Sequence, residues 1–233
     1  MPSDKEYKLT KQIMLGRLTI PKEFKILADW IDKKFDVKTI NLYYDKIEDG
    51  RPRLGVYFEK EEEANIFLED GAFTNYDSTK QRQISDKLKE ILDEQGLLKK
   101  NIFFDFFRSN NDKKYETENI WIYTSAFEPI ARIEANESVP QDNVIQLKSK
   151  IKCKDLWEIS RCFSKTTFFL YTDEQVKQYE NSETRKIWTE KYFDILEPYN
   201  EFGYFERDKY RINLDSKENF DNNYESNWYY YYK

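Results

Sequence analysis

The sequence predicts an α+β protein made of two similar halves, each with a mainly antiparallel sheet packed against helices. Apolar residues recur at helical spacing in some stretches and alternate in others, and turn-forming residues lie between the two kinds. The order of these stretches recurs along the chain, and two predicted strands end in the similar segments Leu42–Asp45 and Leu170–Asp173. Internal duplication explains this recurrence, and so does chance. The candidate halves are residues 1–138 and 139–233.

The first half opens with a helix and a hairpin. Apolar residues at helical spacing predict a helix over Lys22–Phe35, and Pro21 suits its first turn. The alternating segments Thr39–Ile47 and Arg53–Glu59 flank Asp-Gly and Pro residues, which predicts a β-hairpin. A short acidic helix is expected over Lys60–Leu68.

The rest of the first half combines a helix with aromatic strands. Helical periodicity covers Gln81–Gln95, and the apolar run Asn101–Phe107 predicts a strand. Asn119–Tyr123 is its expected partner, and Ala131–Ile133 is a candidate extension of the sheet. Glu134–Asn143 has little apolar content, so we expect a linker there.

The second half repeats helices and strands. A helix is expected over Asp155–Phe163 and a strand over Thr166–Tyr171. Thr172 and the residue three positions later have capping-box spacing, so a helix should run over Asp173–Leu196 with a break near Asn181. The closing strands are predicted at Tyr210–Leu214 and Asn227–Tyr232.

A set of large apolar residues recurs on the inward side of these elements. We expect eight of them to be mostly buried: Leu27, Ile31, Leu42, Leu88, Phe104, Trp121, Trp188 and Phe193. Replacing Phe104 or Trp121 by Ala should therefore destabilise the protein by roughly 3–5 kcal/mol.

Composition excludes several function classes. The chain has 233 residues, a formal net charge of -6, 17% aromatic residues and no histidine. Without histidine, Ser-His-Asp and Cys-His nucleophiles, His-ligated zinc and every His general base are excluded. Acidic residues outnumber basic ones in both halves, which disfavours a nucleic-acid partner. We expect no cofactor and no metal.

The two cysteines and the absence of apolar segments indicate a compartment. No stretch has the ~20 apolar residues of a membrane helix, and no secretory signal is visible near Met1. If the chain between Cys153 and Cys162 is helical, they lie on opposite faces and do not pair. The prediction is a cytoplasmic protein that does not enter a membrane.

Two charged patterns suggest candidate sites. The run Glu59, Glu61, Glu62 and Glu63 suits a solvated first helical turn better than a cation site, since adjacent glutamates diverge around a helix. The alternating lysines from Lys148 to Lys154 suggest either a phosphate-binding stripe or a protected edge strand, and the edge strand is the commoner use.

A divalent-metal-dependent nuclease without histidine is one alternative function, because carboxylates and a lysine can hold a metal and orient water. Its candidate residues are Glu23, Asp49, Glu59 and Lys60. The Glu-x-Lys spacing expected at the end of the second strand is missing. A second alternative is a small-molecule binder whose pocket is lined by Phe103, Trp121 and Tyr123.

The leading hypothesis is a non-catalytic protein that binds another protein. In a terminal strand, Trp228, Tyr230 and Tyr232 would face the core and leave Tyr229 and Tyr231 outward. Tyrosines are effective interface anchors, and an acidic surface suits a basic partner. An immunity- or antitoxin-like inhibitor is one version of this role, with Glu61, Glu62, Glu63, Tyr229 and Tyr231 as candidate contacts.

Overall fold

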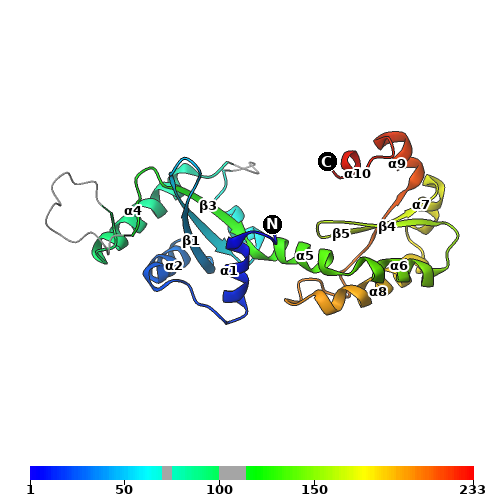
Figure 1. The fold of residues 1–233 in the computed structure, drawn as a ribbon, viewed down its shortest axis with the longest axis horizontal. Coiled ribbons are helices and arrows are strands. Elements are labelled where there is room, and N and C mark those ends of the chain that lie inside the picture. Colours follow the sequence, from blue (N-terminus) through cyan, green and yellow to red (C-terminus); the bar gives the residue numbers. More distant parts are fainter. Residues whose placement is uncertain (70–74, 100–113) are drawn as a thin grey trace. The chain divides into compact units, whose positions relative to one another are not determined.

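The computed structural model describes residues 1–69, 75–99 and 114–233. It contains two compact units, Ser3–Glu128 (unit 1) and Pro129–Lys233 (unit 2), so the division falls inside helix α5 (Phe127–Ser138). The sequence places the division after residue 138. Among these described residues, each unit holds one three-stranded sheet packed against helices, which confirms the predicted α+β class (Figure 1).

Unit 1 is built around a β-hairpin to which a third strand is added. β1 pairs antiparallel with β2, and β3 pairs parallel with β2, so the predicted antiparallel arrangement holds for the hairpin. The helix after Pro21 and the hairpin lie where the sequence predicts them, whereas the first helix was not predicted. The elements before α5 are α1 (Lys5–Met14), α2 (Lys22–Phe35), β1 (Thr39–Lys46), β2 (Pro52–Phe58), α3 (Glu61–Asn65), α4 (Ser78–Glu94) and β3 (Trp121–Ala126).

Unit 2 has the same kind of sheet. β4 pairs antiparallel with β5, and β6 pairs parallel with β5. The predicted capping box is confirmed, since Thr172 Oγ1 accepts a bond from Gln175 N and the long helix is interrupted before Ser182. The elements after α5 are α6 (Gln141–Ile151), β4 (Leu156–Cys162), β5 (Lys165–Leu170), α7 (Asp173–Tyr179), α8 (Glu183–Leu196), the 3₁₀ turn Glu197–Tyr199, β6 (Asn213–Ser216), α9 (Lys217–Tyr224) and α10 (Trp228–Tyr232).

The two units share local details as well as element order. In each, the first strand of the hairpin has a register shift near its start, between Thr39 and Asn41 and between Leu156 and Glu158. In each, the third strand runs directly into a helix whose second residue donates a backbone bond to the residue after the hairpin. These bonds are Glu128 N to Glu59 O (3.0 Å) and Glu218 N to Tyr171 O (3.2 Å). The agreement supports internal duplication, which stays a prediction.

The equivalence differs from the one that the sequence suggests. The sequence aligns Leu27–Asp45 with Leu156–Asp173, but the structure aligns α2 and β1 with α6 and β4. The predicted helix at Asp155–Phe163 is wrong, because this segment is strand β4. The register shift in β4 breaks the strand's period of two, so Leu156, Ile159 and Phe163 fall at helical spacing.

Four other segments are helical, wholly or in large part, where the sequence indicates something else. α6 replaces the extended lysine stripe, since Val144 and Leu147 are buried at helical spacing. α5 and α6 also occupy the expected sheet extension at Ala131–Ile133 and the expected linker Glu134–Asn143. The last predicted strand is helix α10, which Asn227 caps through a bond from Tyr229 N (2.9 Å).

Most of the predicted core residues, like most of the predicted elements of unit 1, are found where the sequence places them. Six of the eight predicted core residues are buried, and Trp121 is only partly buried because β3 points it away from the core. Phe104, Phe103 and the predicted strand Asn101–Phe107 lie outside the described residues. Tyr210–Leu214 overlaps β6 only at Asn213 and Leu214.

Each sheet packs one face against helices, and we call this its first face. In unit 1, Leu42, Val56 and Ile122 on the first face pack with Leu27 of α2 and Leu88 of α4. In unit 2, α6 and α8 supply Leu147, Trp188 and Tyr192 against Phe168 of β5. The opposite, second face of each sheet is covered differently and is described below.

Candidate functional site

The predicted acidic run contributes only two outward carboxylates. Glu61 and Glu62 of α3 are exposed. Glu63 is used internally, because its two carboxylate oxygens accept bonds from Lys38 N (2.9 Å) and Lys60 N (3.2 Å). This part of the candidate interface is therefore narrower than the sequence indicates.

The residues proposed for a nuclease each have a structural partner. Tyr115 donates to Glu23 (2.7 Å), and hydrogen bonds from the backbone and from Tyr115 lower the pKa of Glu23. Asp49 accepts from Arg51 N (2.8 Å) in the hairpin turn, and Lys60 forms an ion pair with Glu128 (2.7 Å). Within the described part of the chain, no three Asp, Glu or Cys side chains gather closely enough to hold a metal ion.

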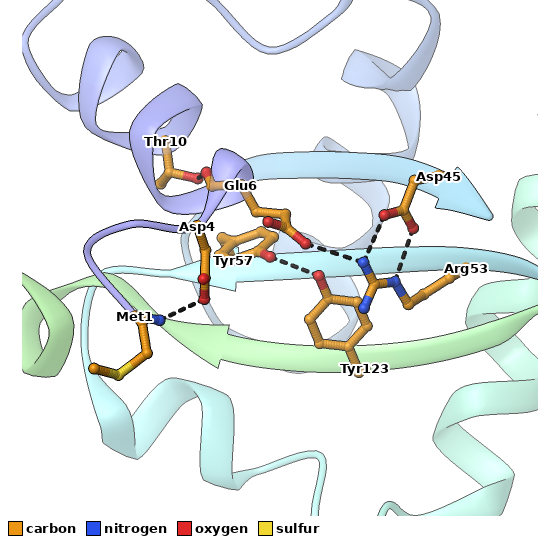
Figure 2. Close-up of polar contacts among 8 residues, drawn as sticks. All are labelled: Met1, Asp4, Glu6, Thr10, Asp45, Arg53, Tyr57 and Tyr123. Carbon is orange, nitrogen blue, oxygen red and sulfur yellow. Dashed lines mark hydrogen bonds and ion pairs between the residues drawn. The ribbon is translucent and has the colours of Figure 1, made fainter. Parts of the chain in front are cut away.

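The second face of the unit 1 sheet carries a polar cluster (Figure 2). Arg53 of β2 donates to both carboxylate oxygens of Asp45 (2.8 and 2.5 Å) and to Glu6 of α1 (3.0 Å). Beside it, the hydroxyls of Tyr57 and Tyr123 are 2.6 Å apart, and burial raises the pKa of Tyr123 to about 12. The charged groups therefore bond to one another, and so do the two hydroxyls.

This cluster bears on the predicted aromatic pocket. Trp121 and Tyr123 do lie side by side on β3, with ring centroids 5.5 Å apart. The Tyr123 hydroxyl and the Arg53 guanidinium are, however, both engaged by neighbouring side chains. The polar cluster on this face therefore connects α1 to the sheet through hydrogen bonds, and we do not place the binding site there.

The C-terminal tyrosines separate into an exposed and a packed set. Tyr229 is 67% exposed. Tyr231 faces inward instead, since its hydroxyl donates to Asp215 (2.5 Å) and its ring lies 5.2 Å from that of Phe169. Burial raises the pKa of Tyr231. The prediction that Tyr231 points outward is wrong because the segment is helical.

An open groove of about 1000 Å³ lies along β4, and we call it the β4 groove. Its floor is β4 itself from Leu156 to Arg161. One wall is α6, which presents Ile145, Lys148 and Lys152, and the other includes Trp228 of α10. Ile145 is 54% and Trp228 is 37% exposed, so both walls offer apolar surface to solvent.

The floor of the groove is a strand edge. β4 is the outer strand in the order β4-β5-β6 of the described sheet. The Ile159 amide is turned away from β5 and donates instead to the Glu158 carboxylate (2.8 Å), which also pairs with Lys148 (3.1 Å). A side chain thus occupies a backbone donor that an added strand would otherwise bind.

Opposite charges lie at the two ends of the groove. Lys152 is exposed at the C-cap of α6, just before β4 begins. Glu137 lines the groove near the other end, because it follows Asn136, whose side chain donates to the carbonyl of Phe163 just after β4 (2.9 Å). Arg161 also lines this end, but its guanidinium donates to two backbone carbonyls and to a side-chain amide oxygen. Lysines 148 and 152 therefore line this groove, whereas the predicted single stripe of four lysines is wrong.

Sequence reasoning did not identify this groove. Ile145 was the available signal, because it is an apolar residue on the polar side of a helix whose inward positions are Val144 and Leu147. Trp228 is predicted to face the core from a strand, whereas it lies in helix α10 and is 37% exposed. The apolar residues of β4 fall at helical spacing, so the sequence does not indicate a strand edge there.

Comparison with protein-family models, with curated proteins and with solved structures finds no match for this chain. Cys153 and Cys162 are both free thiols. Across the described ranges, no helix has the length and apolar character needed to cross a bilayer.

Proposed function

We propose that this chain is a non-catalytic protein-binding protein and that the β4 groove is its binding site. The observation that carries the proposal is the combination of an outer strand edge with exposed Ile145 and Trp228 on the two walls. Tryptophan is enriched at interface positions that dominate affinity, and apolar residues around a concave surface are typical of binding sites. Partner binding uses such a surface without any catalytic group.

The more specific immunity- or antitoxin-like role rests on charge. The net charge of -6 and the exposed Glu61 and Glu62 support attraction of a basic partner. Two free cysteines support action in a reducing compartment, the cytoplasm. Both statements extend the proposal and do not carry it.

The test is selection of peptide ligands from a displayed random library on the immobilised full chain. Selected peptides should bind the wild type and lose roughly tenfold or more in affinity when Ile145→Asp places a charge in the groove wall. Ile26→Asp is the matched control, since Ile26 on α2 is 55% exposed and lies in the other unit. If every selected peptide binds Ile145→Asp as tightly as wild type, the proposed site is wrong.

A further inference from the structure

The chemistry of the β4 groove specifies what enters it. We infer that its occupant is an extended segment of a partner protein that pairs antiparallel with β4, with a basic residue at its N-terminal end and an acidic residue at its C-terminal end. This inference rests on the proposed function.

The floor selects an extended backbone. Only a strand can align a row of backbone donors and acceptors with the outer edge of β4, and strand addition between an edge strand and a neighbouring helix is a recurring mode of peptide recognition. Six consecutive residues of β4, Leu156 to Arg161, line the groove, which corresponds to roughly 20 Å of extended chain. A bound segment would displace the Glu158 carboxylate from the Ile159 amide.

The walls argue against a second copy of this chain. Two copies of β4 paired edge to edge would lie about 4.8 Å apart, whereas packed helices need about 8–10 Å between their axes. Because α6 forms one wall directly beside β4, the two copies of α6 would compete for the same space above the joined edge. A single strand without an accompanying helix avoids this conflict.

The charges at the two ends give the segment a direction. Glu137 lines the groove near the end of β4, since it follows Asn136, which donates to the carbonyl of Phe163 (2.9 Å). Lys152 lies near the beginning of β4. Arg161 also lines the Glu137 end, but its guanidinium donates to two backbone carbonyls, so Glu137 is the exposed charged residue there. An antiparallel segment starts beside Glu137 and ends beside Lys152, so complementary charge is basic first and acidic last. Antiparallel pairing is also slightly more stable per residue than parallel pairing.

The first test uses charge reversal. Peptides selected on the wild type should carry Lys or Arg toward the N-terminus and Asp or Glu toward the C-terminus, and those selected on Glu137→Lys/Lys152→Glu should show the reverse order. Both residues are exposed, and the double variant keeps the net charge. Acidic-first peptides on the wild type would indicate parallel pairing, and unordered charge would remove the ends from recognition. Either result overturns the inference.

The second test uses a selected peptide methylated at one backbone nitrogen at a time. Strand addition predicts that affinity falls by roughly tenfold at every second position, where the N–H faces β4, and changes little at the positions between. A period of three to four, or no period, would overturn strand addition while leaving the proposed function intact. Loss of that function would appear separately, as equal binding to wild type and Ile145→Asp.

Sedimentation velocity distinguishes the remaining occupant. The wild-type chain should sediment as a monomer over the concentration range of the binding assay. A dimer that the selected peptide dissociates would show that a second copy occupies the groove, and it would overturn the inference.

Discussion

The second faces of the two sheets are covered in contrasting ways. In unit 1, the N-terminal helix α1 lies over polar side chains and is held by the Glu6–Arg53 ion pair and by a bond from Asn41 to Thr10 (3.0 Å). In unit 2, α9 and α10 cover Phe169 with aromatic rings, among them Phe220 and Trp228. The same strand arrangement therefore supports a cover held mainly by polar side chains in one unit and a cover made mainly of aromatic rings in the other.

This difference shows which interactions are interchangeable in the fold. Phe169 and Tyr57 occupy the same position, each one residue before the end of the second hairpin strand. Phe169 is completely buried and makes no hydrogen bond through its side chain, whereas Tyr57 is buried with its hydroxyl paired to Tyr123. Either chemistry can therefore exclude water from the second face of such a sheet.

The largest effect is expected in the apolar cover. Phe169→Ala should lower the free energy of unfolding by roughly 3–5 kcal/mol, because it removes a fully buried ring against which α9 and α10 pack. Urea unfolding measures the loss, and hydrogen exchange should show increased opening of α10. Phe163→Ala is the control, since Phe163 is 51% exposed. Equal effects of the two substitutions would contradict the apolar account.

A smaller loss of folding stability is expected from a substitution at Gly55, where unit 1 lacks a side chain. A Cβ at Gly55 would lie 2.5 Å from the Tyr123 hydroxyl oxygen, whereas unit 2 carries Thr167 at the equivalent position. Gly55→Ala should cost about 1–3 kcal/mol through overpacking. Combining it with Tyr123→Ala should cost less than the sum of the two single changes, and additivity in thermal unfolding would show that the clash is relieved elsewhere.

The paired hydroxyls of unit 1 give a test of roughly 1 kcal/mol. Tyr57→Phe or Tyr123→Phe alone should destabilise by about that amount, because the remaining hydroxyl loses its partner in a largely buried site. The double change to Phe removes both hydroxyls and leaves an apolar pair, and it should recover most of the loss. A double variant that is less stable than either single one would show that the hydroxyls have other partners.

The smallest expected effect is a loss of folding stability at low pH. Hydrogen bonds from Lys46 and Lys99, both at 2.7 Å, lower the pKa of Glu116 below its ordinary 4.5. A carboxylate with a lowered pKa stabilises the fold above its unfolded pKa, and the contribution is lost as the pH falls through the folded value. Because these groups are largely solvated, we expect less than about 1 kcal/mol. Glu116→Gln should remove this part of the acid sensitivity in urea unfolding. An unchanged pH profile would contradict it.

The predictable parts of the fold are those in which local pattern and tertiary environment agree. Helix α2 and the β1–β2 hairpin combine clear periodicity with Pro21 and the Asp-Gly turn, so the sequence suffices. The predictions for the segments of β4 and α10 are wrong for opposite reasons. In β4, a register shift places the apolar residues at helical spacing although the segment is a strand. In α10, residues that favour strands are helical because Asn227 caps the helix and the ring of Tyr231 packs against Phe169.

The candidate site was less predictable than the fold. The β4 groove depends on which strand is outermost, and the order β4-β5-β6 follows from a parallel pairing between distant segments. Local patterns contain no information about that order. Glu63 shows the converse, because a carboxylate that looks solvated in the sequence bonds to the amide of Lys38, which is distant in the chain.

The parallel third strand also determines how each sheet can form over time. The hairpins join neighbouring residues, but Phe58 must meet Ala126 in unit 1 and Leu170 must meet Ser216 in unit 2. Closing these long loops is paid for in chain entropy before the new contacts form, which slows folding. Each hairpin should therefore be structured early, with an edge of β2 or β5 exposed until its third strand docks. During that interval the nascent chain is most vulnerable to aggregation through unpaired strands.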